Sequence, residues 1–251
     1  CEDMLTEDRY EYIIENINRN NSVKLKDLVD ILGTSESTVR RDLDELEARG
    51  FLKRVRGGAI SSSNFTQDIS INTRKHENTD SKIALGRYCA SLVEDGDCLY
   101  LDAGTTTNEI IPFLKGKDIV VVTNGIHNID RLVENKIRSY IIGGSIKPMT
   151  NTIVGEMAVE NLSHYRFTIA FIGANGISYK SSITTPDVSE AAVKKKAIQL
   201  SKRPYVVADS SKFDKVSFSE ICRLEDVSII TNVSEDEIDP RIVEASEVIT
   251  I

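Results

Sequence analysis

The first sixty residues carry apolar positions at helical spacing. Three stretches each repeat apolar residues three and four positions apart, as in helices that bury one face. The apolar positions are Tyr10, Ile13, Ile14 and Ile17; Leu25, Leu28, Val29 and Leu32; and Val39, Leu43 and Leu46. Gly33 suits the left-handed position after a helix, and Ser35 suits the N-cap of the next one. Two short helices joined in this way are typical of a helix-turn-helix.

The residues after Gly50 predict a small β-hairpin, because the chain alternates around Gly57 and Gly58. Beside a helix-turn-helix, such a hairpin is a wing. Four cations and no acid lie between Arg49 and Ile60, which gives this segment a local positive charge. A protein that binds DNA needs such a charge where it meets the phosphates.

The third helix is the one expected to enter the major groove. Small hydroxyls in its first turns suit phosphates and base edges, and arginine can bond to guanine through two nitrogens. The candidate DNA-binding residues are Ser35, Ser37, Thr38, Arg40, Arg41, Lys53, Arg54, Arg56, Gly57 and Gly58. Periodicity alone fits equally well a three-helix domain that presents a solvated charged face.

Beyond the hairpin, short apolar runs alternate with amphipathic stretches. This alternation predicts an α/β fold with a doubly wound parallel sheet. The expected strands are Cys98–Ala103, Ile119–Thr123, Ser139–Ile142, Ile169–Gly173, Tyr205–Ala208 and Ser228–Thr231. The expected helices include Asn108–Leu114, Ile126–Glu134, Val154–Leu162 and Ser189–Ser201. The predicted organisation is a DNA-binding domain at 4–60, a polar linker at 61–74 and an effector domain at 75–251.

Small and polar residues follow several predicted strands, where ligands bind in such sheets. Gly104 and three threonines after it resemble an anion cradle, although a hydroxyl-capped helix start would look the same. Lys82 and Lys212 are either phosphate counter-charges or solvated lysines. Asp102 could accept from a sugar hydroxyl, and Glu190 either contacts a hydroxyl or complements the N-terminus of its helix. The candidate effector-binding residues are Lys82, Asp102, Gly104, Thr105, Thr106, Thr107, Thr123, Asn124, Gly143, Gly144, Asn175, Glu190, Asp209 and Lys212.

Composition narrows the class of protein. With 40% hydrophobic and 28% charged residues, the chain has the composition of a soluble globular protein. No apolar run reaches the roughly 18–20 residues of a membrane span, and the acidic start lacks the core of a signal peptide. The net charge of −8 argues against a generally basic nucleic-acid coat. The four cysteines and three histidines have no metal-ligand spacing. We therefore expect a cytoplasmic protein with reduced thiols, no metal and no cofactor.

Both halves of the sequence resemble the DeoR family of bacterial repressors. In the first half the resemblance rests on the spacing of Arg9, Ile13 and Ile17 and on the run from Ser35 to Leu43. In the second half it rests on six further motifs, and together they cover Leu5 to about Asn232. These motifs are Asp102-x-Gly104-Thr105-Thr106, Thr123-Asn124, Gly143-Gly144, Phe171–Gly176, Thr184–Asp187 and Asp209–Lys212. The chain departs from many relatives at Thr168, where they carry an acid.

The resemblance implies a winged helix-turn-helix followed by a sensor domain similar in fold to sugar-phosphate isomerases. It implies a repressor of a sugar-catabolic operon that binds double-stranded operator DNA and is released by a phosphorylated sugar. The runs Phe171–Ser178 and Thr184–Asp187 look most like fructose-operon repressors, whose effector is fructose 1-phosphate. Galactose-pathway and glycerol-pathway relatives stay open as alternatives. A homodimer or homotetramer is expected, since helix-turn-helix proteins usually bind repeated half-sites.

An enzyme is the competing hypothesis: a sugar-phosphate isomerase with an added N-terminal domain. Isomerisation needs a carboxylate base, for which Asp102, Glu190 and Asp209 could each serve. The same carboxylates would hold the hydroxyls of a bound sugar, so they do not discriminate. The basic helix-turn-helix does, because an isomerase has no use for it. The sequence therefore favours a regulator without enzymatic activity.

Overall fold

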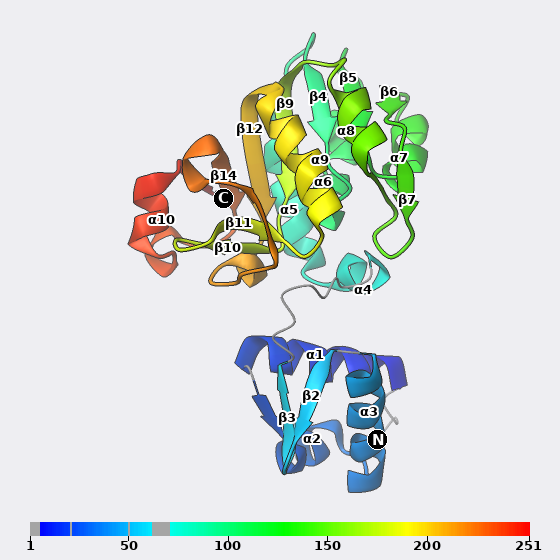
Figure 1. Ribbon diagram of the computed structural model, residues 1–251, viewed down its shortest axis with the longest axis vertical. Helices are drawn as coiled ribbons and strands as arrows, with labels where there is room; N and C mark the ends of the chain where they lie inside the picture. Colours follow the sequence, from blue (N-terminus) through cyan, green and yellow to red (C-terminus); the bar gives the residue numbers. More distant parts are fainter. Residues whose placement is uncertain (1–5, 21, 50, 62–70) are drawn as a thin grey trace. The chain divides into compact units, whose positions relative to one another are not determined.

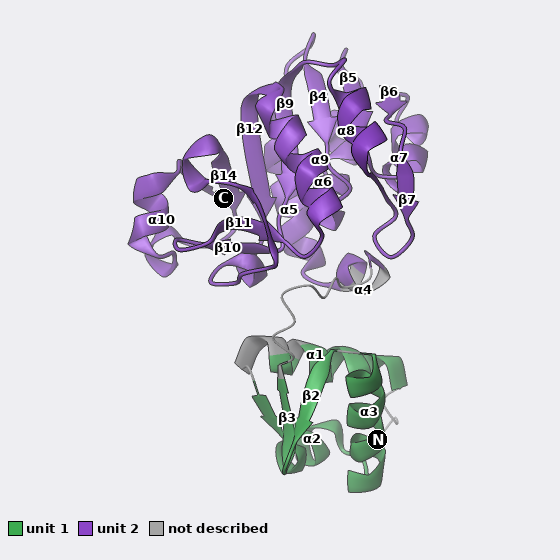
Figure 2. Cartoon of the chain, viewed as in Figure 1, with its two compact units in different colours: residues 1–67 green, residues 68–251 purple. Residues whose placement is uncertain are grey.

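The computed structural model describes residues 6–20, 22–49, 51–61 and 71–251. The chain divides into two compact units, residues 1–67 and 68–251 (Figure 2). Of the linker expected at 61–74, residues 62–70 lie outside the described residues, as do residues 4 and 5 of the expected DNA-binding domain. Ile71–His76 forms a helix that belongs to the second unit.

The first unit contains the three predicted helices and the predicted hairpin, and the sheet has a third strand (Figure 1). The sheet order is β1-β3-β2, with both pairs antiparallel. The elements are α1 (Thr6–Asn20), β1 (Ser22–Lys24), α2 (Leu25–Leu32), α3 (Glu36–Ala48), β2 (Leu52–Val55) and β3 (Gly58–Ser61). The predicted apolar positions of the helices form its core, and Ile13, Val39 and Leu43 are fully buried.

The strand β1 was not predicted from the sequence, and Gly58 explains how it fits. A Cβ at this position would lie 2.0 Å from the Val23 carbonyl oxygen, so only glycine lets β1 approach the hairpin. Gly57 has a φ of +90° in the hairpin turn, and its carbonyl accepts a hydrogen bond from the Leu25 amide at 2.8 Å. Gly33 adopts the expected left-handed conformation after α2. The two hairpin glycines therefore have structural roles that are independent of DNA.

The second unit confirms the predicted doubly wound architecture. All seven strands of the main sheet run parallel, in the order β15-β14-β12-β9-β4-β5-β6. Its first elements are α4 (Ile71–His76), α5 (Thr79–Ser91), β4 (Cys98–Leu101), α6 (Thr105–Asn108), β5 (Val120–Thr123), α7 (Asn128–Glu134), β6 (Arg138–Ile141), β7 (Ser145–Lys147), β8 (Thr152–Val154), α8 (Glu156–Leu162) and β9 (Phe167–Gly173). The remaining elements are β10 (Gly176–Ser178), β11 (Ser182–Thr185), α9 (Val188–Gln199), β12 (Ser201–Ala208), β13 (Ser219–Cys222), β14 (Ser228–Thr231), α10 (Pro240–Ala245) and β15 (Val248–Thr250).

Alternate residues of the central strands feed two separate apolar layers. Tyr100 and Ala170 pack with α8 and α9 on one face, whereas Leu99 and Phe171 pack with α5 and α7 on the other. This alternation follows from the two-residue period of a strand. Helices on both faces bury the sheet, which leaves the carboxyl ends of its strands as the place where a ligand can approach.

Two predicted helices differ in extent, and two small sheets were not predicted. The helix expected at 108–114 is two short pieces, α6 and a 3-10 turn at Ile111–Leu114, because Pro112 has no amide hydrogen to continue an α-helix. The helix expected from 154 begins at Glu156, after a strand and after Gly155, whose φ is +98°. The small antiparallel sheets β10-β11-β13 and β7-β8 were not predicted. No helix in the described ranges combines the length and the apolar character that a membrane crossing needs.

The first unit contains a largely buried ion pair between its first and third helices. Arg9 Nε lies 2.7 Å from Asp42 Oδ2, and the two side chains are 12% and 5% exposed. Asp42 is thus a charged group on the buried face of α3, beside Val39, Leu43 and Leu46. A buried carboxylate of this kind depends on its partner, because little water is present to solvate it.

We predict that Arg9→Ala destabilises the first unit by about 3–5 kcal/mol, because it leaves the Asp42 carboxylate buried without its partner. Hydrogen exchange of the α3 amides in the full chain measures this free energy of opening. The control is Glu45→Ala, which breaks the exposed Arg49–Glu45 pair and should cost under about 1 kcal/mol. Equal effects of the two substitutions would show that the buried pair contributes no more than a surface pair.

Candidate functional site

The helix α3 begins with a cluster of hydroxyls at the residues predicted to contact DNA. Ser35 caps the helix, and its Oγ accepts a hydrogen bond from the Thr38 amide at 3.2 Å. The same oxygen lies 2.8 Å from Ser37 Oγ and 2.9 Å from Thr38 Oγ1. Mutual hydrogen bonds therefore hold the three hydroxyls in place at the exposed start of the helix.

The arginines of this surface differ in how they are engaged. Arg40 pairs with Glu36 at 2.6 Å, and both side chains are more than half exposed. Arg41 is exposed, and the described residues offer it no hydrogen-bond or ion-pair partner. Arg54 pairs with Asp44, and its amide donates to Glu47 Oε1 at 2.7 Å. Arg41 is therefore available for an incoming base or phosphate, and Arg40 becomes available after it breaks one exposed pair.

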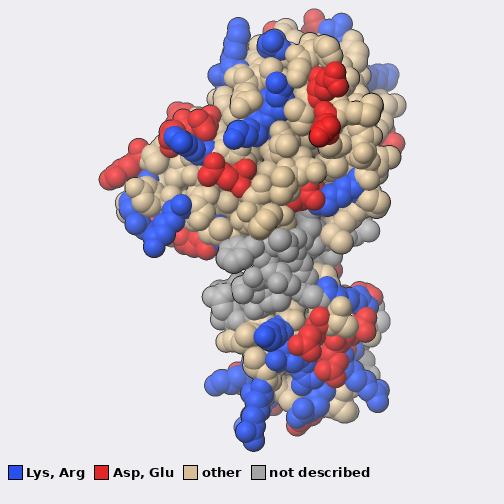
Figure 3. Space-filling view, in the orientation of Figure 1, with Lys and Arg blue, Asp and Glu red and all other residues tan. Residues whose placement is uncertain are grey.

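The wing adds positive charge around its turn. Lys53 and Arg56 are exposed on the strand β2 and the turn after it. Figure 3 shows Lys and Arg side chains projecting at the end of this unit where β2 and β3 meet, with acidic side chains gathered elsewhere on the same face. The unit thus has a local basic surface, although the net charge of the whole chain is −8.

The second unit contains a pocket at the carboxyl ends of three adjacent strands, β12, β9 and β4. The sequence predicts the effector site at this end of the strands. Eight predicted residues line the pocket: Lys82, Asp102, Gly104, Thr105, Thr106, Asn175, Glu190 and Lys212. Further lining residues without a predicted role are Arg74, Glu77, Ala103, Thr150, Thr152, Gly173, Ala174, Lys194 and Val207.

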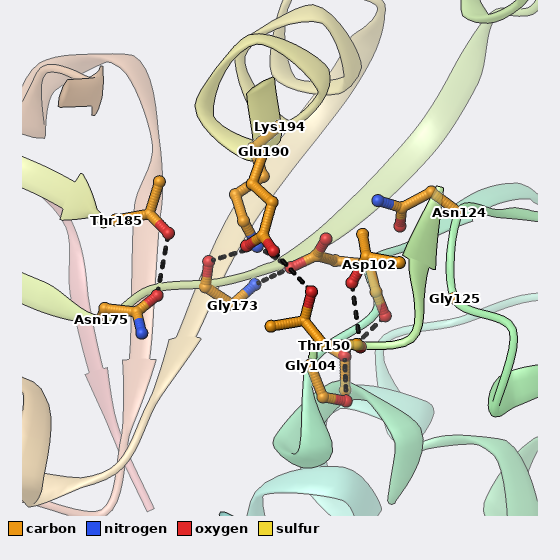
Figure 4. A network of polar contacts seen from close by, with 12 residues as sticks. Asp102, Gly104, Asn124, Gly125, Thr150, Gly173, Asn175, Thr185, Glu190 and Lys194 are labelled. Carbon is orange, nitrogen blue, oxygen red and sulfur yellow. Dashed lines mark hydrogen bonds and ion pairs between the residues drawn. The ribbon is translucent and has the colours of Figure 1, made fainter. Parts of the chain in front are cut away.

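A buried ion pair lies at the centre of the pocket (Figure 4). Lys194, from α9, bonds to Oδ2 of Asp102, which directly follows β4. The same oxygen accepts a hydrogen bond from the Gly173 amide at 2.9 Å, and Lys194 Nζ donates to the Gly173 carbonyl at 3.1 Å. The other oxygen, Oδ1, is buried and has no partner among the described residues, so it can accept a hydrogen bond from a ligand.

A second carboxylate, Glu190, stands one helical turn before Lys194 on α9. Its Oε1 accepts hydrogen bonds from Thr150 Oγ1 at 2.7 Å and from Lys147 Nζ at 3.1 Å. Lys147 also lies 3.1 Å from Asp187, the residue that caps α9. The hairpin β7–β8 therefore brings a lysine and a threonine to the pocket from a segment in which no functional residue was predicted.

The other end of the pocket carries positive charge. Burial lowers the pKa of the Lys82 ammonium, and nearby Lys212 and Arg74 lower it further, against the opposing effect of Asp209. Lys82 Nζ donates to the Arg74 carbonyl. Burial alone would raise the pKa of Asp209, but Lys212 and hydrogen bonds from Ser211 hold it below its ordinary value. Cations so close together favour the binding of an anion.

Six predicted effector residues do not line the pocket: Thr107, Thr123, Asn124, Gly143, Gly144 and Asp209. The hydroxyls of two of them bond to the backbone, Thr107 to Asp102 at 2.8 Å and Thr123 to Leu101 at 2.6 Å. Gly144 leaves room for the strand β8, since a Cβ there would lie 2.8 Å from the Val154 carbonyl. Asp209 caps a 3-10 turn and acts on the pocket through Lys82 and Lys212.

Lys194 is the main residue that sequence analysis left without a role. Its spacing of four residues from Glu190 places both on one face of a helix, and this was the available signal. The described residues contain no group of three or more His, Cys, Asp or Glu that could hold a metal ion.

We predict that His127, which precedes α7, makes the protein sensitive to acid. Burial lowers the pKa of its ring to about 4, and Lys75 adds to this, whereas the Gly104 backbone opposes it. An unfolded histidine titrates near about 6.5, so the unfolded state binds the extra proton between these values. Stability is therefore full above about pH 6.5 and falls as the pH drops towards 4, by about 3 kcal/mol in total.

Urea unfolding between pH 4 and 7 measures this decrease, which should be largely absent in His127→Gln. The exposed His164 provides the control, since His164→Gln should keep the pH dependence of the parent protein. An NMR titration that placed the His127 pKa near 6.5 would contradict the prediction.

Comparisons with known proteins agree with this geometry. Residues 77–233 match the DeoR C terminal sensor domain, and residues 9–65 match the DeoR-like helix-turn-helix domain. The chain is 44% identical to the uncharacterized HTH-type transcriptional regulator FruR of Bacillus subtilis, over 93% of each chain. It is 32% identical to the lactose phosphotransferase system repressor of Staphylococcus epidermidis, over 91% of this chain and 92% of the other.

Among solved structures, ribose 5-phosphate isomerase A from Methanocaldococcus jannaschii matches with a TM-score of 0.42 and 17% identity, over 55% of each chain. The delta subunit of eIF2B from Chaetomium thermophilum matches with a TM-score of 0.46 and 15% identity, over 79% of this chain and 63% of the other. These values carry no information on function. The relatives in sequence are transcriptional regulators rather than enzymes, and the chain belongs to the DeoR family of helix-turn-helix transcriptional regulators.

Proposed function

We propose that the protein represses a sugar-catabolic operon and leaves its operator when a phosphorylated sugar, best matched by fructose 1-phosphate, binds the second unit. The observation that carries the proposal is the division of the pocket into a cationic end and a carboxylate end. The first suits a phosphate, and the second suits sugar hydroxyls. A relative named as a repressor supports the direction of regulation.

At the cationic end, the phosphate would lie against the turn from Gly104 to Thr106. Gly104, Thr105 and Thr106 line the pocket there at the start of α6, and Lys82 and Lys212, which also line it, supply the charge. Charge-assisted hydrogen bonds of this kind are about twice as strong as neutral ones. Without a phosphate, these donors would stay unpaired, so a free sugar should bind far more weakly.

At the carboxylate end, hydroxyls of the sugar would donate to Asp102 and Glu190. Asp102 has a buried oxygen without a partner, and Glu190 is fixed by Lys147 and Thr150. Because both carboxylates are held by cations, they offer acceptors in fixed positions. Lys194, which lines the same end, joins them as a proposed effector-binding residue.

The identity of the sugar rests on similarity. The resemblance to fructose-operon repressors in the runs Phe171–Ser178 and Thr184–Asp187 accords with the 44% identity to the regulator named FruR. Identity to the lactose phosphotransferase system repressors is lower, at 32%. Fructose 1-phosphate is therefore the first effector to test.

The short helix α4 could transmit the binding of a ligand in the pocket to the linker that precedes it in the sequence. Arg74 and Glu77 line the pocket, and the Ile71 amide bonds to the Met149 carbonyl at 3.2 Å. The helix α4 directly follows residues 62–70 of the linker in the sequence. A ligand changes an equilibrium only if it binds the two states with different affinity. Contacts of the phosphate with Arg74 and Lys82 would supply that difference if this segment moves between the two states.

For DNA, we predict that Arg41→Ala or Arg40→Ala weakens specific operator binding by roughly 1–3 kcal/mol for each base that the arginine reads. Replacement of Lys53 or Arg56 by alanine should act on all sequences and reduce the salt slope of binding by about 0.9 per phosphate neutralised. Gel-shift titrations over a range of salt concentrations measure both effects. Lys180→Ala, at an exposed lysine of the second unit, is the control. Operator binding at parental strength in both arginine variants would refute the assignment.

For the effector, we predict that fructose 1-phosphate at about 100 times its Kd stabilises the protein by roughly 2.7 kcal/mol and releases the operator. Lys212→Ala should abolish both responses and leave operator binding unchanged, whereas Lys180→Ala should keep all three. Thermal shift, calorimetry and gel shift give the readouts. If free fructose binds as tightly as fructose 1-phosphate, the phosphate site is wrong. If the protein turns over the sugar phosphate, it is an enzyme and the proposed function fails.

A further inference from the structure

The strand β6 forms an open edge of the main sheet. The sheet order ends at β6, and in the part of the chain that the structure describes no further strand pairs with it (Figure 1). All four residues of the strand are exposed, including Tyr140 at 49% and Ile141 at 43%. An exposed edge with apolar side chains is a template for pairing with another strand.

The backbone groups that this edge presents can be identified from one hydrogen bond. The Ile142 amide donates to the Thr123 carbonyl of β5 at 3.1 Å, so the backbone groups of Ile142 point toward β5. The direction of the backbone amides and carbonyls alternates from residue to residue along a strand. Those of Tyr140 therefore also point toward β5, whereas those of Ser139 and Ile141 point outward. The edge therefore offers two donors and two acceptors at a spacing that fits an antiparallel partner.

Exposed apolar side chains continue from this edge onto the next elements. Ile146 of β7 is 62% exposed, Met149 is 52% exposed and Met157 of α8 is 71% exposed. Large exposed apolar residues on elements that follow one another in the chain often mark a protein interface. We call Tyr140, Ile141, Ile146, Met149 and Met157 the edge patch.

Opposite charges lie near the two ends of β6, which suits antiparallel pairing with a second copy of the strand. Lys136 and Arg138 lie at the amino end of β6, and both are exposed. At the carboxyl end lies the start of α8, where Glu156 is exposed. A Cβ on Gly155, the residue before it, would be 3.8 Å from Ser145 Oγ, so α8 begins beside the start of β7. A two-fold axis perpendicular to β6 brings the basic end of one strand against the acidic end of the other.

We propose that the edge patch binds a second copy of this chain, with the two β6 strands paired antiparallel about a two-fold axis. Ser139 and Ile141 of one copy would exchange backbone hydrogen bonds with Ile141 and Ser139 of the other. Tyr140 then stands opposite its own counterpart at a non-hydrogen-bonded pair. The two sheets become one continuous sheet, and the pairing is closed, as a two-fold interface requires.

A tyrosine opposite a tyrosine suits this position. The Tyr140 ring already lies 6.3 Å from Tyr165, which is stacked 6.4 Å from Phe167. A second Tyr140 would extend this row of rings across the interface, and cross-strand aromatic pairs stabilise sheets. A second copy is also what a helix-turn-helix needs to bind two half-sites.

The mass of the chain in solution tests the proposal. Light scattering should show a dimer, or a tetramer that contains this dimer, and the double variant Tyr140→Asp with Ile141→Asp should halve that mass. Phe218→Asp, at a residue that is 60% exposed elsewhere, should leave the mass unchanged. Circular dichroism and melting temperature verify that the exposed substitutions keep the fold. A parent protein that is monomeric, or a double variant with the parental mass, would overturn the proposal.

A cysteine cross-link tests the register independently. Non-hydrogen-bonded antiparallel pairs hold their Cα atoms about 4.5 Å apart, within the range of a disulfide. Tyr140→Cys should therefore form a covalent dimer under mild oxidation, whereas Phe218→Cys and the parent protein should not. Cys89 and Cys222 are buried and should not react, and the parent protein is the control for Cys1 and the half-buried Cys98. Absence of the cross-linked dimer in Tyr140→Cys would exclude this pairing of the strands.

Discussion

The second unit depends on the buried contact between Asp102 and Lys194. Through Oδ2, the Asp102 carboxylate ties the end of β4 to the Gly173 amide at the end of β9 and to Lys194 of α9. Removal of one member of such a pair typically costs about 3–5 kcal/mol, because the other charge stays buried. The pair therefore fixes the two central strands and the covering helix where the pocket forms. A ligand hydroxyl that reaches Asp102 meets an acceptor whose position the fold already determines.

The sequence was sufficient to predict the pocket's location, because the carboxyl ends of parallel strands meet at one edge of the sheet. Asp102, Gly104 and Asn175 follow strands that apolar runs reveal, and the structure brings them to one pocket. Lys194 could not be assigned in this way, since its partner Asp102 lies 92 residues earlier. Lys147 and Thr150 were missed because a hairpin outside the main sheet delivers them, and no strand-helix alternation marks that hairpin.

Small residues were a weaker guide than charged ones, for a physical reason. A glycine is required wherever two backbone segments approach closely, with or without a ligand. Gly58 and Gly144 meet the carbonyls of Val23 and Val154, so neighbouring strands account for both. Threonine hydroxyls are ambiguous in the same way, as Thr123 shows by bonding to Leu101. Only the packing of neighbouring segments separates such positions from Thr105 and Thr106, which line the pocket.

In each unit a buried ion pair joins segments that are distant in sequence. Arg9 and Asp42 connect α1 to the helix expected to bind DNA, just as Asp102 and Lys194 connect β4 to α9. The helix α3 is thus fixed from its buried side, while Ser35, Arg40 and Arg41 on its exposed side stay accessible to DNA. An exposed pair such as Arg40–Glu36 contributes little to stability and is readily broken. Under the proposed function, this combination of rigid support and weakly held side chains would let α3 exchange the Arg40–Glu36 pair for a contact with DNA without a change in its position.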